Sequence, residues 1–85
     1  MQRYLTQLNL NHFAIIKKID LPNEIRERLH SLGIIEGLKI RFVNTTPLKD
    51  PLIYQVLNSY IAIRRNLAKN IIIETEWKKI LNKKH

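Results

Sequence analysis

Two glycines in one short connection constrain this chain more than any other feature of its sequence. Gly33 and Gly37 are the 2 glycines among its 85 residues. They separate a segment with the apolar spacing of a helix from a segment with the alternation of a strand. Because glycine takes a positive φ more readily than any other residue, this pair predicts a sharp corner where a helix ends and a strand begins. We expect the fold to depend on that corner.

The segment before Gly33 has the pattern of an amphipathic helix. Its apolar residues fall on one helical face: Leu21, Ile25, Leu29 and Leu32. Pro22 suits a first turn, and Asp20 or Asn23 can cap the helix. We therefore expect one main helix that buries this face and ends at Gly33.

Apolar and β-branched runs predict the strands. The expected strands are residues 12–19, 38–42, 51–57, 59–64 and 71–73, with Asn58-Ser59 as a hairpin turn. In the second strand Leu38, Ile40 and Phe42 should face the core, while Lys39 and Arg41 face water. Residues 64–70 should form a helical turn with Leu67 and Ala68 inward, and residues 71–73 should be buried on both faces.

This order of elements favours a mainly β fold. We expect a small barrel of about five strands, closed by its first and last strands, with one α-helix between the first two strands and a short helical turn before the last. Residues 1–76 should form this domain, and residues 77–85 a basic C-terminal extension. The extension has the pattern of one or two turns of amphipathic helix around Trp77, or of a frayed end.

The charge balance favours an acidic partner. Lys and Arg number 15 and Asp and Glu 7, which gives a net charge of +8. Nucleic acid, anionic lipid and acidic protein surfaces all remain open on this ground. The sequence has no cysteine, so disulfides and thiolate metal sites are excluded. No apolar run approaches the roughly 18 residues of a membrane span, and we expect a soluble, cytoplasmic protein.

An ordered set of motifs resembles the FeoA family of ferrous iron transport accessory proteins over residues 5–74. The set consists of Arg28-Leu29, Leu32-Gly33-Ile34, Glu36-Gly37, Pro47, Asp50-Pro51, Ile61-Ala62-Ile63-Arg64, Ala68 and Ile71-Ile72-Ile73. The resemblance implies that nine of these residues are structural positions of the family: Leu29, Leu32, Gly33, Gly37, Pro47, Asp50, Pro51, Ala62 and Ala68. Where many members have glycine, this chain has Asn11, Lys49 and Asn58.

The resemblance implies an SH3-like β-barrel without catalysis or cofactor. It implies docking on the cytosolic GTP-binding region of a membrane ferrous iron permease. The protein would then be peripheral to the membrane through that partner, at its inner face when docked. A homo-oligomer stays open. The alternatives are a small barrel that binds nucleic acid, which we do not expect, and a regulatory domain that binds a transition metal.

One pair of residues has a spacing found in metal sites. Glu27 and His30 share a helical face in the spacing Glu-x-x-His of carboxylate metal centres. A pair supplies two ligands where stable sites need three or four, so we expect an exposed hydrogen-bonded pair and keep the metal role as a weak candidate. His12 and His85 have no ligand spacing, and the sequence contains neither a phosphate-binding loop nor a nucleophile triad.

Partner-binding candidates come from charge and aromatic residues. A cationic rim could form from Arg26, Arg28, Arg64, Arg65 and Lys69. Such a rim would steer the protein to an acidic surface, although an ordinary solvated face has the same composition. Tyr54 and Tyr60 could be interface anchors or cross-strand packing, and we favour packing.

Overall fold

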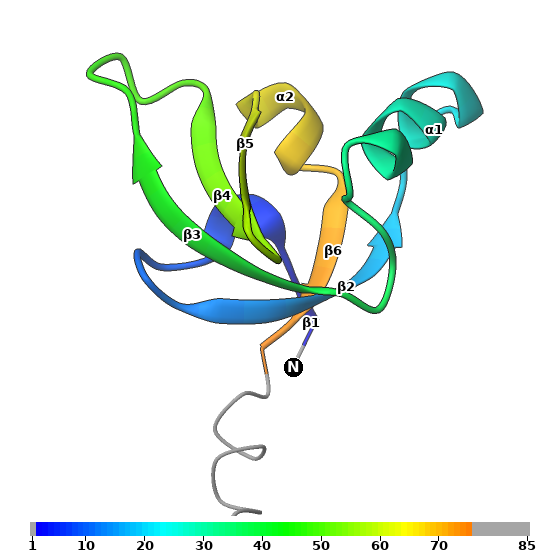
Figure 1. The fold of residues 1–85 in the computed structure, drawn as a ribbon, viewed down its shortest axis with the longest axis horizontal. Helices are drawn as coiled ribbons and strands as arrows, with labels where there is room; N and C mark the ends of the chain where they lie inside the picture. Colours follow the sequence, from blue (N-terminus) through cyan, green and yellow to red (C-terminus); the bar gives the residue numbers. More distant parts are fainter. Residues whose placement is uncertain (1, 76–85) are drawn as a thin grey trace, which may run out of the picture.

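The computed structural model describes residues 2–75 as a strongly curved antiparallel sheet with two α-helices at one end (Figure 1). In chain order the elements are β1 Gln2–Tyr4, the 3-10 helix η1 Leu5–Gln7, β2 Phe13–Ile19, α1 Asn23–Ser31, β3 Lys39–Thr45, β4 Leu52–Val56, β5 Ser59–Ile63, α2 Arg65–Ala68 and β6 Ile71–Glu74. The predicted C-terminal extension lies outside the described residues. Within residues 2–75, no helix is long and apolar enough to cross a membrane.

The strand order explains how the sheet curls. Neighbouring strands follow the order β1-β6-β2-β3-β4-β5. β2 pairs antiparallel with β6, which confirms that the first and last predicted strands meet. Between residues 2 and 75, β1 and β5 form the two edges and do not pair with each other. The sheet is therefore barrel-like without full closure. The helix α2 connects β5, at one edge, to β6, which lies next to the other edge strand (Figure 1).

The N-terminal segment adds a strand that the sequence did not predict. β1 pairs with β6 in the register Arg3 to Ile73. Behind it, Leu5 and Leu8 are buried, and the hydroxyl of Tyr54 donates a hydrogen bond to the carbonyl of Leu5 at 3.2 Å. A three-residue strand is too short to show alternation, so no periodic signal marked it.

The core is apolar throughout the described part of the chain, with no buried charged residue. It consists of Leu5, Leu8, Ala14, Ile16, Ile19, Leu29, Ile34, Ile40, Leu52, Tyr54, Val56, Ile63, Ala68, Ile71 and Ile73. Other residues predicted to face inward are half-buried and pack against this core: Leu21, Ile25, Leu38, Phe42 and Leu67. Leu32, which was also predicted to face inward, is exposed. Ile72 is half-buried, so β6 is not fully covered on both faces.

Two local predictions were wrong. The β4–β5 turn consists of Leu57 and Asn58, because Ser59 already pairs with Val56 in the ladder. The left-handed residue of this turn is Leu57 (φ 55°). In addition, no side chain caps the start of α1. The Asn23 side chain instead accepts a hydrogen bond from the guanidinium of Arg26, one turn later.

Candidate docking surfaces

The corner after α1 is a Schellman motif. The amide of Ile34 donates to the carbonyl of Leu29 at 2.9 Å, and the amide of Gly33 donates to the carbonyl of His30 at 3.0 Å. Gly33 has φ 97°. Leu29 and Ile34 are both buried and provide the apolar contact that accompanies this motif. The predicted helix end at Gly33 is confirmed.

The second glycine fixes the corner to the sheet. Gly37 has φ 94°, and its amide donates to the carbonyl of Ile16 in β2 at 2.7 Å. A Cβ at Gly33 or Gly37 would meet no atom within 4 Å. Glycine is therefore required at both positions by backbone conformation and not by lack of space.

Leu32 is exposed, contrary to the prediction of a buried position. The chain turns at Gly33, directly after Leu32, so that Ile34 lies beside Leu29 in the core. Leu32 and Ile35 then point outward, with 52% and 42% of their surfaces exposed. Helical periodicity stops applying at the last helical turn, which is why it failed here.

His30 pairs with Glu36 and not with Glu27. Nε2 of His30 lies 2.9 Å from Oε1 of Glu36, across the corner. A backbone hydrogen bond at Glu36, followed by the hydrogen bond and charge of His30, lowers the pKa of the Glu36 carboxyl. In residues 2–75 no three His, Cys, Asp or Glu side chains gather as metal ligands would. Glu27 and His30 thus do not form the predicted pair.

The β3–β4 loop is held by hydrogen bonds to α2. Oδ1 of Asp50 accepts the Arg65 amide at 2.9 Å, and the carbonyl of Lys49 accepts Nε of Arg65 at 2.6 Å. Lys49 has φ 64°, a left-handed conformation that is rare for a side chain of its size. The residue at the start of α2 provides no side-chain cap, and Asp50 supplies one from the β3–β4 loop.

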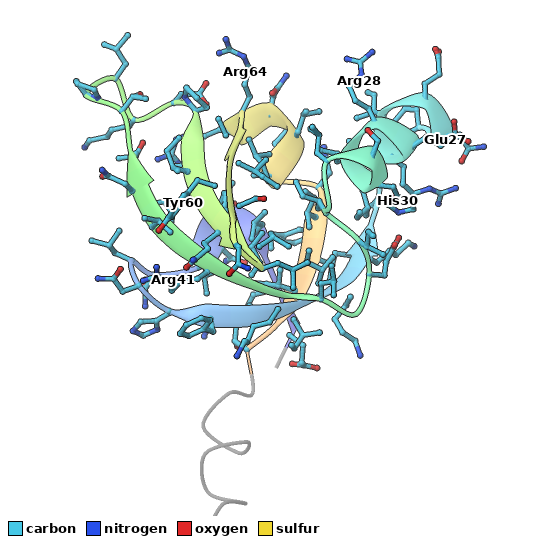
Figure 2. The ribbon with its side chains drawn as sticks, in the orientation of Figure 1. Glu27, Arg28, His30, Arg41, Tyr60 and Arg64 are labelled. Carbon is cyan, nitrogen blue, oxygen red and sulfur yellow. The ribbon has the colours of Figure 1, made fainter. Side chains whose placement is uncertain are left out.

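The predicted cationic rim is distributed over two helices. Arg28 projects from α1 and Arg64 from the start of α2, both from the end of the molecule that carries the helices (Figure 2). Arg26 bonds to Asn23, and Arg65 bonds to the β3–β4 loop. Lys69 is exposed at the end of α2. Two of the five cations thus already have intramolecular partners.

The two tyrosines have different environments. Tyr54 is 1% exposed, and its ring centre lies 5.3 Å from that of Phe42. Burial raises the pKa of its phenol. Tyr54 is therefore a core residue, which corrects its place among the partner-binding candidates and confirms the packing alternative. Tyr60 is 63% exposed and stays available to a partner.

The strand registers align four side chains from four strands in a row that the sequence did not predict. Phe13 pairs with Arg41, Arg41 with Gln55, and Gln55 with Tyr60, across β2, β3, β4 and β5. Residues directly opposite in a ladder point to the same face of a sheet. This outer-face row therefore presents two aromatic rings, an amide and a guanidinium on the side away from the core. The row cannot be predicted from the sequence, because it depends on how neighbouring strands are paired and no local pattern gives that pairing.

Comparison with known proteins identifies the family. The FeoA domain model matches residues 3–75. The chain belongs to the FeoA domain family. It is 29% identical over 70 residues to a fusion of Fe(2+) transport protein A with the Fe(2+) transporter FeoB from Porphyromonas gingivalis. That match spans 82% of this chain and 8% of the fusion protein.

Two solved FeoA structures resemble this one. The FeoA protein of Chlorobium tepidum is 26% identical, with a TM-score of 0.79 over 85% of this chain and 69% of that one. The FeoA of Stenotrophomonas maltophilia, solved with zinc and described as a procaryotic SH3 domain protein, is 30% identical, with a TM-score of 0.72 over 86% of this chain and 91% of that one. These matches confirm the predicted SH3-like fold.

Asn11, Lys49 and Asn58, which stand where many FeoA proteins have glycine, differ in backbone conformation. Asn11 and Lys49 have φ 65° and 64°, so both take the left-handed conformation that glycine would supply. Asn58 does not, because the hairpin places its left-handed residue at Leu57. At two of the three positions this chain therefore holds a side chain in a left-handed conformation.

Proposed function

We propose that this protein is a non-enzymatic, cytoplasmic accessory protein of ferrous iron transport that docks on the cytosolic GTP-binding region of a ferrous iron permease. The fusion in Porphyromonas gingivalis carries this proposal, because it joins a relative of this chain to the transporter FeoB in one polypeptide. Covalent linkage keeps two domains at high effective concentration, which benefits proteins that act in contact.

The charge of the chain agrees with docking on an acidic partner. The net charge of +8 favours encounter with an acidic surface. Long-range attraction of this kind raises the association rate more than the final affinity.

The direct test is binding to the permease. The purified protein is titrated into the isolated GTP-binding region and into intact permease in lipid nanodiscs, at about 0.15 M salt, where weak association of surface charges is largely screened. We expect a saturable complex in both cases. Sedimentation of the free protein over the same concentrations determines whether it docks as a monomer or as a homo-oligomer.

A cellular test accompanies the titration. Deletion of the gene should reduce uptake of ferrous iron, and expression of the wild-type chain should restore it. Absence of a complex with either form of the permease, together with unchanged uptake in the deletion strain, would overturn the proposal.

A further inference from the structure

The outer-face row, Phe13, Arg41, Gln55 and Tyr60, contains a cation that is fixed in position but not neutralised. Both Nε and Nη2 of Arg41 donate to Oε1 of Gln55, at 3.0 and 2.6 Å. Nη1 of Arg41 donates to Oδ1 of Asn11 at 3.4 Å. These partners are neutral amides, and a guanidinium has five N–H donors, so charge and donors both remain for an external acceptor.

A second cation lies beside the first. Nζ of Lys39 lies 5.0 Å from the centre of the Phe13 ring, and Cζ of Arg41 lies 5.8 Å from it. Within the described chain neither cation contacts a carboxylate. Attraction to the ring face positions these charges without removing them, since an aromatic ring carries no net charge.

Exposed aromatic rings flank the cations. Phe13 is 39% exposed at one end of the row, and Tyr60 is 63% exposed at the other. Arg41 and Tyr60 lie on the same side of the molecule, away from α1, as Figure 2 shows. Arginine and tyrosine are the residue types most often found at the energetic centres of protein interfaces.

We infer that the outer-face row, together with Lys39, is the surface on which this protein binds an acidic, extended segment of the permease. This inference rests on the proposed function and specifies the surface and the chemistry of the partner. A carboxylate of the segment pairs with the free N–H groups of Arg41, and apolar side chains on either side of it pack on Phe13 and Tyr60. The charge of the row selects an acidic segment.

The arrangement favours this surface over the predicted cationic rim. In the rim, Arg65 holds the β3–β4 loop and Arg26 bonds within α1. The rim cations project from separate helices, whereas the outer-face row is aligned by the ladders of four strands. A preformed row loses less conformational entropy on binding than independent surface side chains do.

The experiment compares matched substitutions on the two surfaces. Arg41→Met keeps an unbranched stem beside Phe13 but removes the charge, and Arg64→Met makes the same change in the rim. Tyr60→Ala removes an exposed ring with no loss of core packing. Dissociation constants for the GTP-binding region and for intact permease are measured for all three, after unfolding curves show that each variant is folded.

We expect Arg41→Met to weaken binding at least about tenfold and Tyr60→Ala about threefold or more, as loss of central interface residues does. Arg64→Met should stay within about twofold, since exposed peripheral charges contribute little to affinity. Arg41→Met should also show a shallower dependence of affinity on salt than the wild type.

The other possible results distinguish failure of the proposed function from failure of the inference about the outer-face row. If the wild-type protein does not bind the permease, the proposed function fails. If it binds, but Arg41→Met and Tyr60→Ala bind as well as the wild type, or Arg64→Met weakens binding as much as Arg41→Met does, the inference about the outer-face row is wrong. Tighter, row-dependent binding to single-stranded DNA or RNA than to the permease would assign the row to nucleic acid and also overturn it.

Discussion

The corner after α1 and the loop between β3 and β4 both reverse the chain through residues of positive φ, but with different residues and different φ values. The corner uses Gly33 and Gly37, at φ 97° and 94°, whereas the loop uses Lys49 at φ 64°. In the loop, hydrogen bonds from Arg65 to Lys49 and Asp50 hold the strained residue. The corner has a larger φ, outside the range where a side chain is tolerated. Tertiary hydrogen bonds can thus replace glycine only where the required conformation is one that other residues can reach.

The largest effect should come from the apolar side of the corner. Ile34 is 0% exposed and closes the Schellman motif against Leu29. Ile34→Ala should lower the free energy of unfolding by about 2–4 kcal/mol, because it leaves a cavity in a packed core. Urea denaturation measures the loss, with Ile35→Ala at the exposed neighbour as the control. Equal effects at the two positions would contradict the assignment of Ile34 as the buried anchor.

The next effect tests whether the corner needs glycine. Gly33→Ala should cost about 1 kcal/mol, because an alanine at this φ is strained even though its Cβ meets no neighbour. Thermal unfolding at matched pH determines the difference from the wild type. A variant as stable as the wild type would show that the corner relaxes without cost.

Removing the cap that Asp50 gives to α2 should lower the free energy of unfolding by about as much as Gly33→Ala does, or slightly less. Asp50→Ala removes the acceptor of the Arg65 amide. We expect a loss of about 1 kcal/mol, typical of a lost helix cap. Thr46 bonds to the Asp50 backbone and keeps its partners in this variant. Asp50→Asn, which retains an acceptor oxygen, should recover most of the loss measured by urea denaturation.

Placing glycine in the loop, by Lys49→Gly, should raise the free energy of unfolding instead of lowering it. Lys49→Gly relieves left-handed strain but increases the entropy of the unfolded chain, so we expect a gain of up to about 0.5 kcal/mol. A clear loss of stability in calorimetry would indicate that the Lys49 side chain contributes contacts that outweigh its strain.

The smallest effect concerns the hydrogen-bonded pair of Glu36 and His30 across the corner. A backbone hydrogen bond at Glu36 and the neighbouring His30 lower the pKa of the Glu36 carboxyl in the folded protein, so folding favours its ionised form. Its contribution is therefore complete at neutral pH and is lost as the pH falls below the ordinary range of a carboxyl and through the lowered folded-state pKa. Glu36→Gln should cost at most about 0.5 kcal/mol at pH 7, as exposed pairs do. The difference from wild type should disappear in unfolding curves at acidic pH.

Much of the fold was predictable because it depends on local rules. The two glycines, the apolar face of α1 and the alternation after Gly37 predicted a helix, a corner and a strand where they occur. The exceptions fall where the local rule changes. Leu32 lies at the turn that ends the helical period, and β1 is too short to have a period.

The candidate site was less predictable. Of the residues proposed from sequence, Tyr54 is buried, His30 pairs with Glu36 rather than Glu27, and Arg65 holds a loop. Tyr60 is exposed as an interface residue must be. Charge and aromatic content indicate which residue types are available, but burial depends on neighbours from distant strands.

The sequence by itself determined the corner at Gly33 and Gly37, the segments that bury an apolar face, and an excess of positive charge. These properties follow from the conformational freedom of glycine and from hydrophobic periodicity, both of which act over a few residues. Tertiary structure alone decided that Phe13, Arg41, Gln55 and Tyr60 share one face. That alignment depends on three strand registers, and a shift of one residue in any of them would send a side chain to the opposite face.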